Sequence, residues 1–542
     1  MKDVLKKEYK SAYYICLVLL AISLPLSKFM MSVFQFVLLI IWLWDGFSLR
    51  SAKTSNESIL KYFLLSAKQN SIHKSKAFLK NKFALIAASL FLLYLVGLIY
   101  HPNWTEAGLE LKGKLPILGL ALIIGSMPVL SQNQYKYLVL WFTFAVFVAV
   151  LSGYVKFFQK SFSDPRDLVL FVSPVRFSLM SCFAIFSSLY YIVRDKFLPQ
   201  KLKVFLTIQL LLILSFLFLI ESIIGLILLL ILVFIIGFIF INSLQKRRLK
   251  IVLGFLITAI PIVLFFTVKS SFEHFYKVER VSFKNLESHT KKGEQYRHDT
   301  INFGIEDGKY IGLYLAEDEL KYAWEQRSNI PYNSNDLKVQ PIRKTIIRYL
   351  NSKNLRKDAN AIDLLTDQDI EQIEAGIANV NYIQNPGLKT RISRILFGLE
   401  VYQRTNDPNG NSLMQRFEYW ENTWDIFTQN PWIGVGYTNL PEAFAKQYSV
   451  KKTTLEKKNQ METHNQYLLV LAGFGLIGFI WFMFSIFSPM ITSRRFHDYH
   501  YLIFMIIIAV SMLTEDTLQT QVGVTFFAFF NSVLLFGKET KH

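Results

Sequence analysis

The sequence is poor in cysteine and in charged residues, and each scarcity excludes a class of protein. Only two of the 542 residues are cysteine, which excludes a disulfide-rich secreted scaffold. Charged residues make up 18% of the chain and hydrophobic residues 52%, whereas a soluble domain carries roughly 25% charged residues. An ordinary soluble enzyme and a disordered protein are therefore excluded. Acidic residues are also too few to balance the basic ones, and the formal charge is +19.

Long apolar runs account for the low charge content. The run from Ile223 to Ile241 has no charged residue, and about 18 consecutive apolar residues predict a membrane span. The sequence predicts an all-α polytopic membrane protein. Its twelve predicted spans lie at about 12–26, 29–49, 83–100, 115–130, 137–158, 174–193, 204–220, 223–241, 251–268, 464–487, 501–513 and 522–537.

The basic residues predict the orientation. The short inner segments hold 25 Lys and Arg, whereas the short outer loops hold five, namely Lys28, Lys112, Lys114, Lys160 and Arg166. Loops rich in Lys and Arg stay on the cytoplasmic side, so both termini are predicted to be cytoplasmic. The net charge lies on that side and reflects topology, so we expect no nucleic-acid partner. The basic segment 50–82 is predicted to touch anionic membrane lipid.

One outer segment differs from the other loops. Residues 269–463 contain 27 Lys and Arg against 26 Asp and Glu, and they predict a folded, mostly helical domain. Helices are expected over 312–327, 340–350, 388–404 and from Ser412 to a stop at Asn430-Pro431. Ser412 with Gln415, and Thr366 with Asp369, are expected to cap helices. The predicted domains are 1–268 with spans one to nine, 269–463 on the outer side, and 464–542 with spans ten to twelve.

His464 is one candidate for chemistry, because it lies where the outer domain meets span ten. A histidine there can be neutral near pH 7 and accept a proton from a hydroxyl. Alternatively, it binds water or caps the helix. The following run Gly473-Phe-Gly-Leu-Ile-Gly478 matches a dinucleotide pattern, but no strand precedes it. The small residues at 472, 473, 475 and 478 are therefore interpreted as contacts between helices.

Arg416 is a second candidate. It lies beside an apolar stripe that is expected to pack on the membrane domain, formed by Leu413, Phe417, Trp420, Trp424 and Phe427. From that edge its planar guanidinium could reach into a cleft and grip a phosphate. The alternative is a salt bridge to Glu418, Glu421 or another surface acid.

Two further segments add candidates. Asn430-Pro-Trp-Ile-Gly-Val-Gly-Tyr437 contains Gly434 and Gly436, which permit a tight turn and close approach of the backbone to a ligand; a plain loop is the alternative. Arg176, near the outer end of span six, either faces a polar cavity or snorkels to the membrane surface. The acids Glu221, Glu515 and Asp516 are expected at the outer surface. No metal site is expected, since the outer histidines have no ligand spacing.

Together these segments resemble the O-antigen ligase / O-antigen polymerase superfamily of bacterial inner-membrane glycosyltransferases. Arg416-Phe-Glu-Tyr-Trp followed by Pro431-Trp-Ile-Gly-Val-Gly436 resembles the family's Arg-x-x-x-Trp helix and Pro…Gly-x-Gly turn. His464-Asn-Gln-Tyr-Leu…Gly-Leu-Ile-Gly478 resembles its His-Asn segment. The resemblance implies a GT-C-like fold of about 12 transmembrane helices in the bacterial inner membrane, with segment 269–463 as a periplasmic domain.

The resemblance also implies a mechanism. A metal-independent, inverting transfer without cofactor would move a glycan from undecaprenyl diphosphate to an acceptor hydroxyl, either on lipid A–core or on a growing glycan. His464 would act as general base, and Arg416 with Arg176 would clamp the diphosphate. Gly434, Gly436, Tyr437 and Asn465 would contact substrate. O-antigen ligation is favoured, while a polymerase of O-antigen or capsule repeat units and a lipid-linked glycan flippase remain alternatives.

The sequence departs from the family at two places. Ile220-Glu-Ser-Ile-Ile-Gly225 lacks the arginine that members often carry after a serine in this region. Residues 272–400 have no evident counterpart in better-described members, and they are expected to bear on the acceptor or a partner.

Overall fold

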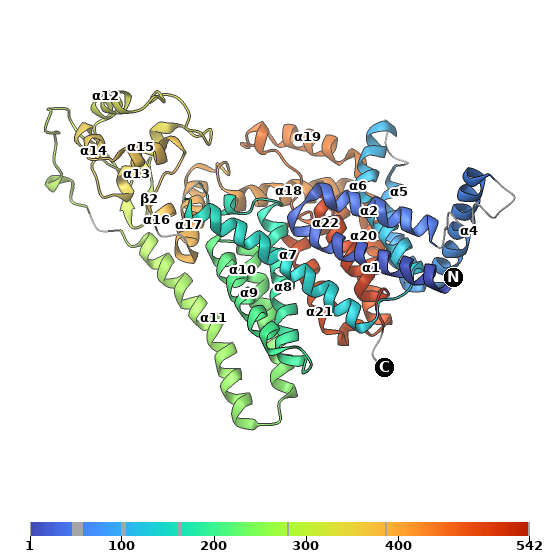
Figure 1. The fold of residues 1–542 in the computed structure, drawn as a ribbon. Helices are drawn as coiled ribbons and strands as arrows, with labels where there is room; N and C mark the ends of the chain where they lie inside the picture. Colours follow the sequence, from blue (N-terminus) through green and yellow to red (C-terminus); the bar gives the residue numbers. More distant parts are fainter. Residues whose placement is uncertain are drawn as a thin grey trace.

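A computed structural model describes residues 2–45, 58–98, 104–159, 162, 164–278, 281–384 and 387–539. A large helical bundle forms one part of the molecule, and a smaller domain stands beyond the end of the long helix α11, Arg247–Tyr276 (Figure 1). Lys160, positions 50–57 of the predicted basic segment, positions 99–100 of the third predicted span, and the predicted cytoplasmic tail at 540–542 lie outside the described residues.

Each predicted span coincides with a helix of the bundle. Among the described residues, six of these helices, α7 to α11 and α20, are long and apolar enough to cross a membrane, and the bent pair of α4 (Ile59–Lys80) and α5 adds a seventh if it is counted as one span. A multi-pass helical membrane protein is thus confirmed, while the number twelve stays a prediction. The helices are α1 (Lys2–Leu26), α2 (Lys28–Trp44), α5 (Lys82–Gly97), α6 (Trp104–Ser126), α7 (Gln132–Phe158), α8 (Pro174–Arg194), α9 (Gln200–Leu219), α10 (Ile223–Ser243), α11 (Arg247–Tyr276), α20 (Gln466–Thr492), α21 (Tyr499–Thr514) and α22 (Gln521–Leu535).

The predicted basic segment 50–82 contains a helix, α4 (Ile59–Lys80), which meets α5 at an angle of 99°. Lys74 fastens α4 to α2, because its ammonium donates to the Trp42 carbonyl at 2.7 Å and pairs with Asp45 at 3.1 Å. Part of this segment is therefore a helix that is attached to α2.

Helices α8 and α22 form the centre of the bundle. Every residue of α22 from Val522 to Leu535 is buried, and aromatic rings join it to α7 and α8. The Phe530 ring centre lies 4.8 Å from that of Phe183 and 4.9 Å from that of Phe142. At the margin, the apolar part of α11 contains no buried residue, as expected for a helix that faces lipid on most sides.

The predicted outer domain, called the outer domain below, has its own apolar core around Trp324, Tyr349 and Ile346. Its helices are α12 (Glu317–Arg327), α13 (Ile342–Ser352), α14 (Ala359–Asp363), α15 (Asp367–Glu374) and α16 (Asn381–Gln384). Two small antiparallel sheets, not predicted, pair β1 (Arg297–Asp299) with β4 (Gly312–Leu315), and β2 (Ile305–Glu306) with β3 (Lys309–Tyr310). The predicted helix 312–327 is wrong in its first part, because Gly312 pairs with Asp299 in the first sheet.

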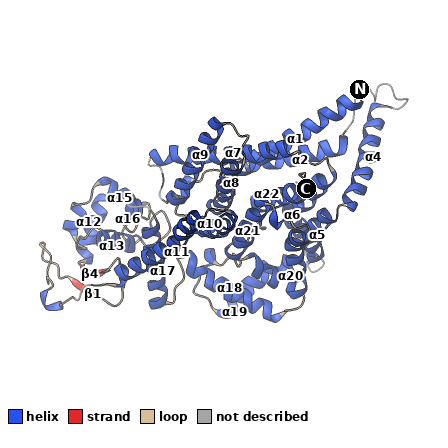
Figure 2. Ribbon diagram, turned by 90° about the horizontal axis from the view of Figure 1, so that it is seen from below, coloured by secondary structure: helices blue, strands red, loops and turns tan. Residues whose placement is uncertain are grey.

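Three helices connect the outer domain to the bundle: α17 (Leu388–Thr405), α18 (Ser412–Gln429) and α19 (Leu440–Lys451). α17 packs against α11, and α18 packs against α20. Figure 2 shows α18 and α19 beside α20, on the side of the bundle away from α1 and α2. Tyr419 and Ile426 of α18 belong to the same buried core as the membrane helices, so α18 is held at a fixed place over them.

The caps and faces of these helices match the predictions in part. Thr366 and Asp369 form the predicted capping box of α15, and α18 ends at Gln429, as Asn430-Pro431 predicts. The N-cap of α18 is Asn411, one residue before the predicted Ser412. The predicted apolar stripe of α18 is only partly covered, because Phe417 and Trp424 are 47% and 52% exposed.

Candidate functional site

Two arginines from distant parts of the chain bind one carboxylate. Glu515, in the short loop between α21 and α22, accepts a hydrogen bond from Arg176 at 2.8 Å and from Arg416 at 2.6 Å, one on each carboxylate oxygen. Glu515 and Arg176 are both about nine-tenths buried, whereas the Arg416 side chain is 25% exposed. The structure therefore brings the two predicted arginines together, and Arg416 lies nearer to solvent.

Arg176 reaches this loop from the beginning of α8. Ser173 caps that helix, and Pro174 occupies its first turn. Besides Glu515, the Arg176 guanidinium binds the backbone carbonyl of Asp516 at 3.0 Å. The alternative of an arginine that snorkels to the membrane surface is therefore wrong, since both partners lie inside the protein.

His464 lies beside the same loop. Its backbone has a positive φ of 48°, which few non-glycine residues adopt, and its N–H donates to Asp516 Oδ2 at 3.0 Å. The imidazole Nδ1 is 3.8 Å from that oxygen. The ring packs at 5.7 Å from the Tyr419 ring of α18. His464 therefore lies between the acidic loop and the Arg416 helix.

The surroundings of His464 favour its neutral form. Burial lowers the pKa of the imidazole below its usual value of 6.5. The negative charge of Glu515 opposes this shift in pKa, whereas the positive charges of Arg416 and Arg176 add to it. A neutral imidazole at physiological pH can accept a proton.

The pKa of Asp516 is shifted in the opposite direction. Burial, together with the nearby Glu462 and Glu515 carboxylates, raises the pKa of Asp516 to about 7. Its Oδ1 is buried and has no hydrogen-bond partner among the described residues. Burial also raises the pKa of Glu462. A proton can therefore reside on this acidic group near neutral pH, close to the imidazole.

Lys114 and Tyr437 bind the other end of the loop between α21 and α22. The Lys114 ammonium donates to the Leu518 carbonyl and to the Gln519 side chain, and the Tyr437 hydroxyl donates to that same Gln519 oxygen. The ammonium also lies 5.5 Å from the centre of the Tyr437 ring, a cation–π contact. The predicted substrate residue Tyr437 thus helps to fix the loop that carries Glu515.

Gly434 and Gly436 lie in a turn that contacts the backbone of α20. Both have a positive φ, of 71° and 89°, and a Cβ on Gly434 would lie 2.5 Å from the Gly473 carbonyl carbon. The turn thus approaches a backbone closely, as predicted, but that backbone belongs to α20. The role of these glycines in substrate binding stays a prediction.

Helix α20 is interrupted where the turn meets it. Gly475 has a φ of 63° and breaks the helical geometry. Val435 and Gly436 donate to the carbonyls of Ala472 and Gly473 at 3.0 Å. A Cβ on Gly475 would lie 2.3 Å from the backbone of Trp432. The predicted contact between helices is found at Gly478, which lies close to Leu93 of α5. Gly473 and Gly475 contact the turn instead of another helix.

Asn465 caps α20. Its amide oxygen accepts from the backbone N–H groups of Tyr467 and Leu468 at 3.0 and 3.1 Å. This hydrogen bonding accounts for an asparagine at the start of an apolar helix. Its predicted contact with substrate is not tested by the structure.

Sequence reasoning missed the acidic loop at the centre of the site. Glu515 and Asp516 were expected at the outer surface, yet they are 7% and 8% exposed. Their signal was available, because two adjacent acids between two apolar helices are costly unless they have partners. Glu221 was likewise expected at the surface; it is 4% exposed and pairs with Arg394 at 3.4 Å.

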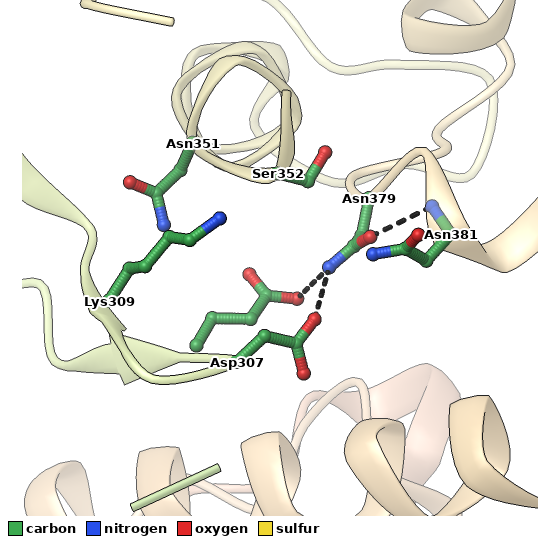
Figure 3. Close-up of a pocket in the computed structure, with 7 residues that line it drawn as sticks. Asp307, Lys309, Asn351, Ser352, Asn379 and Asn381 are labelled. Carbon is green, nitrogen blue, oxygen red and sulfur yellow. Dashed lines mark hydrogen bonds between the residues drawn. The ribbon is translucent and has the colours of Figure 1, made fainter. Parts of the chain in front are cut away.

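A second polar cluster lies in the outer domain and serves its internal packing. Asn379 donates to Glu306 and to Asp307 at 3.1 Å (Figure 3), and Glu306 also pairs with Arg348 at 2.8 Å. The cavity beside them measures about 20 Å³, enough for about one water molecule. Within the described ranges, no three His, Cys, Asp or Glu side chains are grouped so as to hold a metal ion.

Residues 373–483 match the family model described as O-antigen ligase. The predicted resemblance to this superfamily is confirmed, and the matched segment contains Arg416, Gly434, Gly436 and His464. The match begins at residue 373, so the last part of the stretch 272–400 lies within the family model; the expected lack of a counterpart in better-described members stays a prediction. A search of curated proteins found no match.

Proposed function

We propose that this protein transfers a glycan from undecaprenyl diphosphate to an acceptor hydroxyl at the periplasmic face, in ligation of O-antigen to lipid A–core. The family match supports a function of the O-antigen ligase or polymerase type in general, and the apolar helices support a multi-pass protein of the inner membrane. The observation that carries the proposal is the shared contact of Arg176 and Arg416 with Glu515, beside a histidine whose pKa is lowered.

The two arginines would bind the diphosphate. Transfer to a hydroxyl breaks the bond between the anomeric carbon and the diphosphate oxygen, and the electron pair leaves with undecaprenyl diphosphate. Guanidinium groups stabilise that growing charge through paired hydrogen bonds. Arg416 is partly exposed and would contact the diphosphate directly. Glu515 would keep both guanidinium groups in place and offset part of their charge before substrate arrives.

His464 would accept the proton of the acceptor hydroxyl. Its lowered pKa leaves the ring neutral. Asp516 lies 3.8 Å from Nδ1, so a small rotation would let Nδ1–H donate to this carboxylate and leave Nε2 as the proton acceptor. The new bond would form between the acceptor oxygen and the anomeric carbon, opposite the leaving diphosphate. This direct displacement inverts the anomeric centre and needs no metal ion.

The test is a lipopolysaccharide gel from cells that carry His464→Ala or Arg416→Ala in place of the native protein. Loss of the ligase should leave bare core, while polymer accumulates on the lipid carrier. Core with a single repeat would instead indicate a polymerase. The matched controls His497→Ala and Arg404→Ala replace exposed residues of the same types and should leave the gel unchanged. Normal surface glycan in both site variants, at normal protein level, would overturn the proposal.

A further inference from the structure

Helix α18 carries an exposed aromatic stripe that begins beside Arg416. Phe417 and Trp424 are exposed, and Trp420 between them is partly buried against the core of the membrane helices. The ring centres of Phe417 and Trp420 lie 6.0 Å apart. A row of exposed aromatic rings is unfavourable in water, and it marks a surface that another apolar molecule covers.

The other sides of α18 are occupied. Tyr419 is five residues before Trp424 and therefore lies on another side of the helix; it is buried, and its ring lies 5.7 Å from that of His464. On a third side, Lys451 of α19 pairs with Asp425 at 2.7 Å. A ligand on the aromatic stripe would therefore leave the imidazole of His464 open to a second reactant.

The turn after α18 continues the apolar surface. Trp432 and Ile433 are 66% and 51% exposed, and the turn contacts α20, which is long and apolar enough to cross a membrane. The Trp432 carbonyl accepts from the Ile477 N–H at 3.2 Å. From this contact onward, α20 exposes Ile477, Ile480 and Phe484, whose spacing of three and four residues places them on one face of the helix.

The stripe of α18, the turn and this face of α20 form a surface that we call the apolar path. Trp424 lies about 12 Å along α18 from Arg416, and Phe484 lies about 10 Å along α20 from Ile477. A surface of this length suits a long apolar chain better than a compact group.

The beginning of the path identifies the chain. Arg416 would bind the diphosphate of the donor, and its side chain is 25% exposed. The isoprenoid tail is bonded to that diphosphate, so its first units must leave from Arg416. The stripe is the exposed apolar surface beside this residue, and aromatic rings offer such a tail a large contact area.

We propose that the apolar path binds the polyisoprenoid tail of the donor, with the diphosphate at Arg416, the first units against Phe417 and Trp424, and the remainder against Trp432 and α20. The proposal rests on the proposed function, from which it takes the class of donor. It places the leaving group on the stripe side of α18 and the acceptor on the His464 side. An inverting transfer requires this arrangement, because the acceptor attacks opposite the leaving diphosphate.

The test measures binding of two diphosphates to the purified full-length protein in phospholipid nanodiscs, with binding to empty nanodiscs subtracted. Geranylgeranyl diphosphate has a long isoprenoid tail, and dimethylallyl diphosphate has the same head group on a single isoprene unit. We expect the long probe to bind more tightly than the short one. Trp424→Ala or Trp432→Ala should reduce the ratio of the two affinities by about threefold to tenfold, because each removes a large apolar contact with the tail.

Trp141→Ala and Phe238→Ala are the matched controls. They remove exposed aromatic rings from α7 and α10, two other helices that are apolar enough to cross a membrane, and they should leave the ratio unchanged. Arg416→Gln should weaken both probes by a similar factor, because both carry the diphosphate.

An unchanged ratio in both path variants would overturn the proposal. An equal reduction in the control variants would also overturn it, since it would assign these aromatic residues to general contact with phospholipid. Unchanged binding of both probes to Arg416→Gln would do the same. Failure of the proposed function would appear separately, as normal surface glycan in the His464 and Arg416 variants. Lost surface glycan in those variants, together with an unchanged ratio in the path variants, would overturn only the position of the tail.

Discussion

His464 donates its backbone N–H to Asp516 Oδ2 at 3.0 Å, and the Nδ1 of its ring lies 3.8 Å from the same oxygen. One carboxylate thus accepts a hydrogen bond from the unusual backbone of the histidine and lies close to its ring. Because the pKa of Asp516 is raised to about 7 and that of His464 is lowered, a proton near neutral pH lies on Asp516 more readily than on the imidazole. Four predictions follow from these contacts and from those of the neighbouring glycines.

The first prediction concerns the pH dependence of transfer. The base form of His464 is lost as pH falls through its pKa, which lies below the usual 6.5, so the acid limb of the rate profile should lie below that value. Arg416 contributes to the lowered pKa. In Arg416→Gln the limb should therefore move to higher pH, in addition to the drop in rate. An unmoved limb, measured in a reconstituted transfer assay, would argue against His464 as the base.

The second prediction concerns stability and Asp516. Its folded-state pKa of about 7 lies above the ordinary 3.8, so its contribution to stability is largest below pH 4 and is lost as pH rises through 7. Asp516→Asn removes this charge. At pH 8 the free energy of unfolding of the variant should exceed that of the unchanged protein by on the order of 1–3 kcal/mol. The variant should therefore unfold at a higher temperature. The difference should shrink toward pH 5, while transfer slows at both values.

The third prediction concerns Glu515. Glu515→Gln leaves the buried Arg176 without its anionic partner, and removal of one member of a buried ion pair costs about 3–5 kcal/mol. The melting temperature should fall accordingly. Glu421→Gln is the control, because that carboxylate is 67% exposed and pairs with Lys451, and its loss should cost about 0–1 kcal/mol. Equal melting temperatures for both variants would show that Glu515 does not organise the arginines.

The fourth prediction concerns the contact between the turn and α20. Alanine at Gly434 or Gly475 meets backbone atoms at 2.5 and 2.3 Å, and both positions have a positive φ. Each variant should lose about 2–4 kcal/mol of stability. Gly113→Ala adds its methyl group where no atom beyond its chain neighbours and its own helix backbone lies within 4 Å, and its stability should match or slightly exceed that of the unchanged protein. Thermal unfolding in detergent separates these outcomes.

Local features were predictable from the sequence because they depend on neighbouring residues. The cap at Thr366 and Asp369 and the end of α18 before Pro431 are of this kind. The cap of α18 was misplaced by one residue because Asn411 and Ser412 both suit an N-cap. The strand at Gly312 was missed because its partner Asp299 is distant in sequence.

The sequence indicated some of the residues that belong to the site, but not which of them contact one another. Position beside apolar runs indicated Arg176, Arg416 and His464. Glu515, which binds both arginines, comes from a loop far along the chain, and no spacing rule relates such residues. The stripe on α18 was judged by helical periodicity alone, which cannot tell a face that meets protein from one that remains partly exposed at Phe417 and Trp424.

The break at Gly475 has a consequence for assembly in the membrane. A helix interrupted inside an apolar layer exposes backbone groups that lipid cannot satisfy. Here the turn at 431–436 satisfies them, with Pro431 accepting from Leu476 at 2.8 Å and Trp432 accepting from Ile477 at 3.2 Å. Segment 466–492 therefore cannot reach its final form in lipid by itself. It must form together with the turn at 431–436, so α20 and the segment that precedes it mature together.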